Sequence, residues 1–387
     1  MIELIVLAAT TGTALGALVT TIVVARTVRR RVLNRRVRRY ERFEVRLSAH
    51  DEAPPEDLAD AVEAIIGVVR ERADVRWREG QPWLAVEFHH APAPTGELEW
   101  TVCVVCEPRV VRQLDAALAS AYPNVRLGFD FVAEPQPVSG ALRRPVHVER
   151  LRKHKPFVFA LGRDRADGRA APASGAPLVE LVAQAQVAAG APSTVRLTLT
   201  PTLHAVERLA TSLARSEANR AAREERWGAT EAGLRAPQRR RELEGTAPSQ
   251  NRSLCWSELA IGSDDAAACM AVTSALQALR GANRLHRRIV DLRPARTRAR
   301  FVTGEPPLLP VTFAGGLRTL LSSAEIATLI ELPTARMRGV PVRRLMLPRL
   351  PAPPDALRAD GVLQEPPADN EPFDPETFSP APSLEET

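Results

Sequence analysis

The amino-terminal segment restricts this chain more than any other part of the sequence. From Leu4 to Ala25 the sequence is apolar, with no charged residue and no proline. As a helix, these 22 residues would be about 33 Å long, enough to cross a hydrocarbon core of about 30 Å. Ten arginines and only two acids follow between Arg26 and Arg46. By the positive-inside rule, this order predicts a single-pass protein of the plasma membrane, with its amino terminus outside and all later domains in the cytoplasm.

Two other interpretations of the apolar run fit the sequence less well. A cleaved signal peptide carries its basic residues before a shorter apolar core, whereas here they follow it. A buried helix of a soluble domain does not need ten arginines directly behind it. Within the run, Gly12 and Gly16 form a G-x-x-x-G pattern, which lets two helices approach closely in lipid. These two glycines are therefore our candidates for self-association into a homo-oligomer.

The net charge of +6 is concentrated in the arginine block. Lys153 and Lys155 are the only lysines among 52 basic residues, so the arginines are as typical of a GC-rich genome as of a function. Beside an apolar run, basic residues interact first with anionic lipid headgroups, at about 1 kcal/mol each, and only second with DNA phosphates. The lipid bilayer is therefore a predicted partner, and DNA a partner only indirectly.

The rest of the chain alternates between strand-like and helix-like patterns, which predicts an α+β fold. The first half reads in the order β-α-β-β-α-β, which is typical of a ferredoxin-like α/β sandwich, and the second half predicts another. The end of the chain holds ten prolines and nine acids, so we expect it to be disordered. The predicted parts are a transmembrane helix (1–25), a basic juxtamembrane segment (26–42), a first domain (43–132), a linker (133–155), a second domain (156–347) with a long charged helix (203–244), and the tail (348–387).

The sequence shows no pattern of a catalytic or metal site. Neither lysine follows a glycine, so the phosphate-binding loop G-x-x-x-x-G-K-[ST] is absent. Cys103 and Cys106 have the spacing of half a zinc site, but in a strand they would point to opposite faces. His89 and His90 alternate in the same way, and we expect them at the rim of a sheet rather than on a metal. We therefore predict no catalytic, cofactor-binding or metal-binding residue, and no enzyme activity for this chain.

Five short stretches are distinctive when they are taken together with the apolar run. They are FEVRL (43–47), LDAALASAYP (114–123), VRLTLTP (195–201), LSSAEIATLIELP (321–333) and GVPVRR (339–344). In combination they resemble the membrane-proximal, amino-terminal half of actinobacterial conjugation and type IV secretion coupling proteins, of the TraG/TraD-like and FtsK/HerA kind. The resemblance covers about residues 1–354 and ends where the ATPase domain of such proteins begins.

The resemblance implies a non-catalytic, membrane-anchored assembly component of a conjugative DNA-transfer or type IV secretion-like coupling complex. Its motor would then be a separate coupling ATPase. In the resembling proteins the chain enters the ATPase after the GVPVRR segment, so Arg343 and Arg344 are the predicted contact with that partner. Two alternatives stay open: a subunit that completes a split coupling ATPase in trans, and a membrane-bound adaptor that contacts lipid or DNA.

Overall fold

The computed structural model describes most of the chain between Arg38 and Glu331. The described residues are 21–22, 25, 29, 38–46, 53, 55–92, 96–122, 126–127, 145–161, 178–226, 237–240, 242–243, 252–279, 282–287, 294–303, 317–331, 340 and 342. All of the strands and helices named below lie within these ranges.

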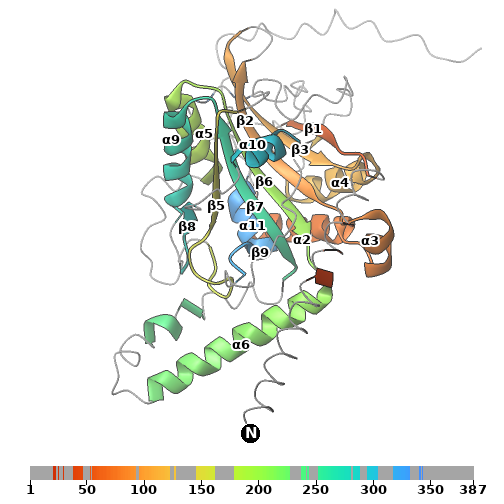
Figure 1. Ribbon diagram of the computed structural model, residues 1–387, viewed down its shortest axis with the longest axis vertical. Coiled ribbons are helices and arrows are strands. Elements are labelled where there is room, and N and C mark those ends of the chain that lie inside the picture. Colours follow the sequence, from red (N-terminus) through yellow and green to blue (C-terminus); the bar gives the residue numbers. More distant parts are fainter. Residues whose placement is uncertain are drawn as a thin grey trace, which may run out of the picture. The chain divides into compact units, whose positions relative to one another are not determined.

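In the part of the chain that the structure describes, a single sheet of nine strands forms the centre of the fold (Figure 1). The strand order is β4-β1-β3-β2-β6-β7-β5-β8, and β9 pairs with one end of β7. All pairings between these strands are antiparallel. The strands are β1 (Glu41–Arg46), β2 (Leu84–Pro92), β3 (Leu98–Cys106), β4 (Arg126–Leu127), β5 (His147–Lys153), β6 (Ser193–Pro201), β7 (Leu254–Ser263), β8 (Leu285–Arg287) and β9 (Leu320–Ser322).

Strands β2 and β6 join the two halves of the chain into this one sheet. They pair from Leu84–Leu199 to His90–Ser193, with Glu87 opposite Arg196. The predicted α+β class is confirmed, but the prediction of two separate ferredoxin-like sandwiches is wrong. The physical reason is that a strand has two edges of backbone N–H and C=O groups, and both need partners. Strand β3 covers one edge of β2, and β6 from the second half covers the other.

Among the described residues, five helices cover one face of the sheet. Apolar side chains alternate along β2 at Leu84, Val86 and Phe88, and they point into a continuous core shared with these helices. The helix α11 contacts both α2 and α5, so it connects helices from the two halves of the chain. The five helices are α2 (Pro55–Val69), α4 (Val111–Ala121), α5 (Leu178–Ala189), α9 (Ala266–Gln277) and α11 (Ser323–Ile330). A 3₁₀ turn, Pro108–Val110, precedes α4.

The opposite face of the sheet carries charged residues and is crossed by α10 (Pro294–Thr303), which lies in front of the strands in Figure 1. The Arg196 guanidinium lies over the ring of Phe301, 4.7 Å from the ring centroid. Glycine at position 262 of β7 permits this approach, because an added Cβ would collide with the Phe301 ring.

Three arginines of the basic block contact the folded body. Arg38 is buried and donates to Glu71 at 3.0 Å and to Glu107 at 2.5 Å. Arg42 forms an ion pair of 2.8 Å with Glu87. Further upstream, the Arg29 guanidinium lies 4.3 Å from the ring centroid of Trp77 on α3 (Ala73–Glu79). The interpretation of the whole block as a lipid-facing segment therefore does not hold for Arg38 and Arg42, which serve the fold.

The predicted transmembrane helix is not shown by the structure. No helix among the described residues is long and apolar enough to cross a membrane, and most of the run from Leu4 to Ala25 lies outside them. Apolarity and length make a segment able to span, and they do not show that it does so. The predicted sites Gly12, Gly16, Arg343 and Arg344, and the tail over 348–387, also lie outside the described residues.

Candidate binding groove

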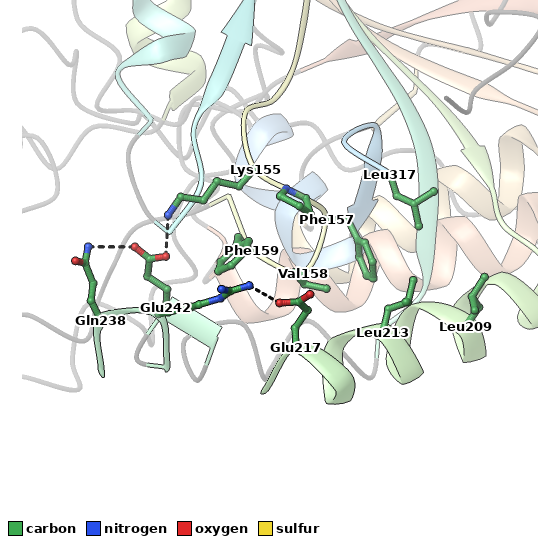
Figure 2. A pocket seen from close by; sticks show the side chains of 12 residues that line it. Lys155, Phe157, Val158, Phe159, Leu209, Leu213, Glu217, Gln238, Glu242 and Leu317 are labelled. Atoms are coloured by element: carbon green, nitrogen blue, oxygen red, sulfur yellow. Dashed lines mark hydrogen bonds and ion pairs between the residues drawn. The ribbon is translucent and has the colours of Figure 1, made fainter. Parts of the chain in front are cut away.

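A groove of about 670 Å³ lies between the helix α6 (His204–Arg226) and the segment that follows β5 (Figure 2). Its volume falls in the range of about 300–1,000 Å³ that is usual for binding pockets. Apolar side chains form its floor and walls, and charged side chains form one end. The lining residues are Lys155, Pro156, Phe157, Val158, Phe159, Leu209, Leu213, Glu217, Gln238, Arg239, Glu242 and Leu317.

The helix α6 supplies one wall because its sequence favours a helix and gives it one small, apolar side. It is rich in alanine, arginine, glutamate and leucine, all good helix formers. Ala210, Ala214 and Ala221 recur at helical spacing and are buried against the body. Leu209 and Leu213 lie one turn apart beside this side, and they are 48% and 40% exposed. Two large exposed leucines next to a groove are a typical feature of a contact surface.

The opposite wall is the segment 156–159, and Asn283 holds its shape. The Asn283 side-chain amide donates to the carbonyl oxygens of Lys155 at 3.1 Å and Phe159 at 3.0 Å. Its side-chain oxygen accepts from the Lys155 backbone N–H at 2.9 Å. Asn283 is buried, so these bonds are shielded from water. The segment is therefore fixed in position before any ligand arrives.

A buried ion pair anchors the two ends of the same segment. Lys153 Nζ lies 2.5 Å from Glu325 Oε1, and the same carboxylate oxygen accepts from the Leu161 backbone N–H at 2.6 Å. Glu325 also closes a capping box with Ser322 at the start of α11. Burial lowers the pKa of Lys153, although the Glu325 carboxylate acts in the opposite direction. The wall of the groove is thus tied to the helix α11 in the core.

The charges at the end of the groove pair with one another. Lys155 donates to Glu242 at 2.7 Å, and Arg239 donates to Glu217 at 2.5 Å, as drawn in Figure 2. Gln238 adds a hydrogen bond of 3.3 Å to Glu242. The charges of the described residues at this end therefore balance, and the groove as a whole favours an apolar segment bounded by polar residues.

A second cluster, in the charged face of the sheet, is the other candidate for chemistry. Glu87 accepts from Arg196 at 2.6 Å and from Arg42 at 2.8 Å, and it is fully buried. Burial alone would raise the pKa of Glu87, but the charge of Arg196, the hydrogen bond from His89 and the charge of Arg42 hold it well below the usual range. Glu87 is thus a carboxylate in the folded protein.

His89 connects Glu87 to a hydroxyl group. Its Nε2 lies 2.8 Å from Glu87 and its Nδ1 lies 2.9 Å from Thr194 Oγ1. Burial lowers the pKa of His89, so the ring is neutral, and Nε2–H donates to the carboxylate while Nδ1 accepts from the hydroxyl. This is the order of a catalytic triad, but Thr194 is only 1% exposed. A substrate therefore cannot reach the hydroxyl in this structure, and the cluster is a structural network.

The four cysteines are also buried and unpaired with one another. Burial raises the pKa of Cys106 and of Cys269 to about 12, and raises the pKa values of Cys103 and Cys255 further. Such thiols are poor nucleophiles and poor metal ligands at neutral pH. Among the residues that the structure describes, no group of three or more histidine, cysteine, aspartate or glutamate residues could hold a metal ion.

The structure differs from the sequence-based predictions in two respects. His89 and His90 are buried inside β2 rather than at a rim, and His90 Nδ1 lies 3.3 Å from the Ala191 carbonyl. The groove itself is not among the predictions, because the sequence pattern indicates only a long charged helix over 203–244. The signal that could have revealed it is Leu209 and Leu213, one turn apart on a polar helix.

No protein-family model matches this chain, and no curated protein sequence matches it significantly.

Proposed function

We propose that the chain is a non-catalytic assembly component of a conjugative DNA-transfer or type IV secretion-like coupling complex, and that it works at the membrane. In this proposal the groove beside α6 binds a segment of a separate coupling ATPase. The complex and its location follow from the sequence resemblance and the arginine block. The volume, lining and fixed wall of the groove support the role that we propose for it.

The observation that carries the proposal is the pair of exposed leucines facing a wall that is already fixed. Leu209 and Leu213 would lose exposed apolar surface when a segment occupies the groove, which is favourable by about 25 cal/mol per Å². Asn283 and the Lys153–Glu325 pair hold the opposite wall, so little ordering is needed on binding. The buried Glu87 cluster offers no comparable access for a substrate.

Co-purification of the full chain with the coupling ATPase of the same transfer system tests this proposal. The variant Leu213→Glu places a charge in the groove, and burying an unpaired carboxylate is costly. We expect the Leu213→Glu variant to retain at most about one tenth of the ATPase that the unchanged chain retains. Met270→Glu is the matched control, because Met270 is also a large exposed apolar residue on a helix, α9, that does not line the groove.

Two results would contradict the proposal. One is an unchanged chain that retains no ATPase. The other is equal retention by the Leu213→Glu and Met270→Glu variants, which would place the contact elsewhere. The contact predicted at Arg343 and Arg344 stays a separate prediction, which charge reversal of both residues tests in the same assay.

A further inference from the structure

A second side of α6 carries a stripe of arginines, distinct from the side that lines the groove. Arg208, Arg215, Arg223 and Arg226 are exposed and recur at spacings of seven, eight and three, so they lie along one line of the helix. The uncharged residues Ser212 and Asn219 lie between them on the same line and are also exposed. The stripe therefore contains no carboxylate.

The glutamates of α6 lie elsewhere on the helix and are held by ion pairs. Glu207 pairs with Arg70, Glu217 with Arg239, and Glu225 with Arg240, three arginines outside α6. The remaining one, Glu224, pairs with Arg220 and Arg239. Since each carboxylate is occupied in this way, the positive charge of the stripe is not neutralised by its own helix.

The basic amino-terminal block is linked through α3 to the start of α6, the helix that carries the stripe. Arg29 lies against Trp77 of α3, and Arg76 of α3 donates to the carbonyl of Pro201, three residues before α6 begins. Arg70, between α2 and α3, donates to Glu207 in the first turn of α6. A chain of direct contacts thus links the block that follows the apolar run to the start of α6.

We propose that the arginine stripe of α6 binds the anionic headgroups of a phospholipid bilayer. The proposal extends the membrane location proposed above, and it assigns a lipid contact to residues far from the amino terminus in sequence. A line of exposed arginines with no carboxylate among them matches the charge of an anionic bilayer surface. The start of α6 is also linked by contacts to the basic block that follows the apolar run, and this favours lipid over a nucleic acid or an acidic protein as the ligand of the stripe.

A fluorescent label on the stripe tests the proposal in the full chain. The native cysteines are buried and their thiol pKa values are raised, so Ser212→Cys provides a single reactive thiol. The labelled chain is reconstituted with phosphatidylcholine vesicles, or with vesicles that contain about one third phosphatidylglycerol, both carrying a headgroup-attached quencher. We expect quenching at position 212 with the anionic vesicles only. The same label after Ser274→Cys, on the exposed side of α9, should not be quenched.

Removing arginines from the stripe distinguishes headgroup binding from a helix that only lies near the vesicle surface. The double variant Arg215→Gln, Arg223→Gln should weaken the headgroup contact about 25-fold, at about fivefold per arginine. A chain that associates with the vesicles but shows no quenching at position 212 would overturn this inference and leave the membrane location intact. A chain that binds neither kind of vesicle would overturn both. If a short DNA duplex changes the label at position 212 and anionic vesicles do not, the stripe binds nucleic acid and the lipid assignment is wrong.

Discussion

Glu87 is the residue on which the charged face of the sheet depends. It is fully buried, and it accepts hydrogen bonds from Arg196, Arg42 and His89. Two arginines are held near it in the interior, where an unpaired charge is far more costly than at the surface. The carboxylate therefore determines whether this face of the sheet can be buried at all.

Removing the charge of Glu87 should destabilise the protein. We expect Glu87→Gln to lower the free energy of unfolding at pH 7 by about 3–5 kcal/mol, because the two guanidinium groups lose their carboxylate. Urea unfolding followed by circular dichroism measures the change. Glu97→Gln is the control, since Glu97 is exposed, and its unfolding midpoint should not move.

The stabilisation that Glu87 provides should depend on pH. The pKa of Glu87 is lowered in the folded state, so its stabilisation is present above the pKa of about 4.3 in the unfolded chain and is lost as the pH falls. The pKa of His89 is also lowered in the folded state. It therefore adds a loss of stability at higher pH, which starts as the pH falls through about 6.5, the pKa of histidine in the unfolded chain. The deficit of Glu87→Gln should therefore shrink below about pH 4. A deficit that is the same at pH 3 and pH 7 would contradict our assignment of a buried carboxylate.

At the scale of elements, α10 covers the charged face and fits closely against β7. Phe301 stacks on Arg196, and its ring occupies the space that a side chain at position 262 would need. The groove is built by elements in the same way, from α6 on one side and the segment after β5 on the other. In both places, helices bring together parts of the chain that are far apart in sequence.

Gly262→Ala tests the contact between α10 and β7. The added methyl group collides with the Phe301 ring, so we expect a loss of about 1–3 kcal/mol in the free energy of unfolding. Gly67→Ala, in α2, is the matched control, because a Cβ there meets no atom within 4 Å. Alanine also favours a helix over glycine by about 0.5–1 kcal/mol, so this variant should be as stable as the unchanged chain or more stable. Equal losses in both variants would show that α10 does not pack on β7 as described.

At the scale of the whole molecule, the sequence predicted the type of structure better than the way its halves combine. The patterns of 83–88 and 194–200 indicate strands, and the structure has strands there, β2 from Leu84 and β6 from Ser193. The pairing of β2 with β6 could not be predicted, since hydrophobic periodicity reports which face of a strand is buried and not which strand covers its edge. The groove depends on two further pairings, of β7 with β6 and of β7 with β5, because α6 directly follows β6 and the opposite wall follows β5.

The predicted transmembrane helix and the basic block show a second limit of prediction from sequence patterns. Composition identifies a run that is able to cross a bilayer, while the described residues contain no helix of that kind. The basic block as a whole is predicted to face lipid, yet Arg38 pairs with Glu71 and Glu107, and Arg42 pairs with Glu87. Glu71 lies between α2 and α3, Glu107 directly after β3 and Glu87 in β2, and only the fold brings them near. Charge patterns along a sequence do not reveal partners at such distances.

Both halves of the chain form one body around one sheet. Pulsed hydrogen exchange with mass spectrometry, along a urea series on the full chain, tests this architecture. Peptides from β2 and β3 in the first half and from β6 and β7 in the second should lose protection at the same urea concentration, because β2 and β6 share a ladder of hydrogen bonds. Two separated midpoints, with β2 and β3 unfolding apart from β6 and β7, would contradict the single sheet and favour two independent domains.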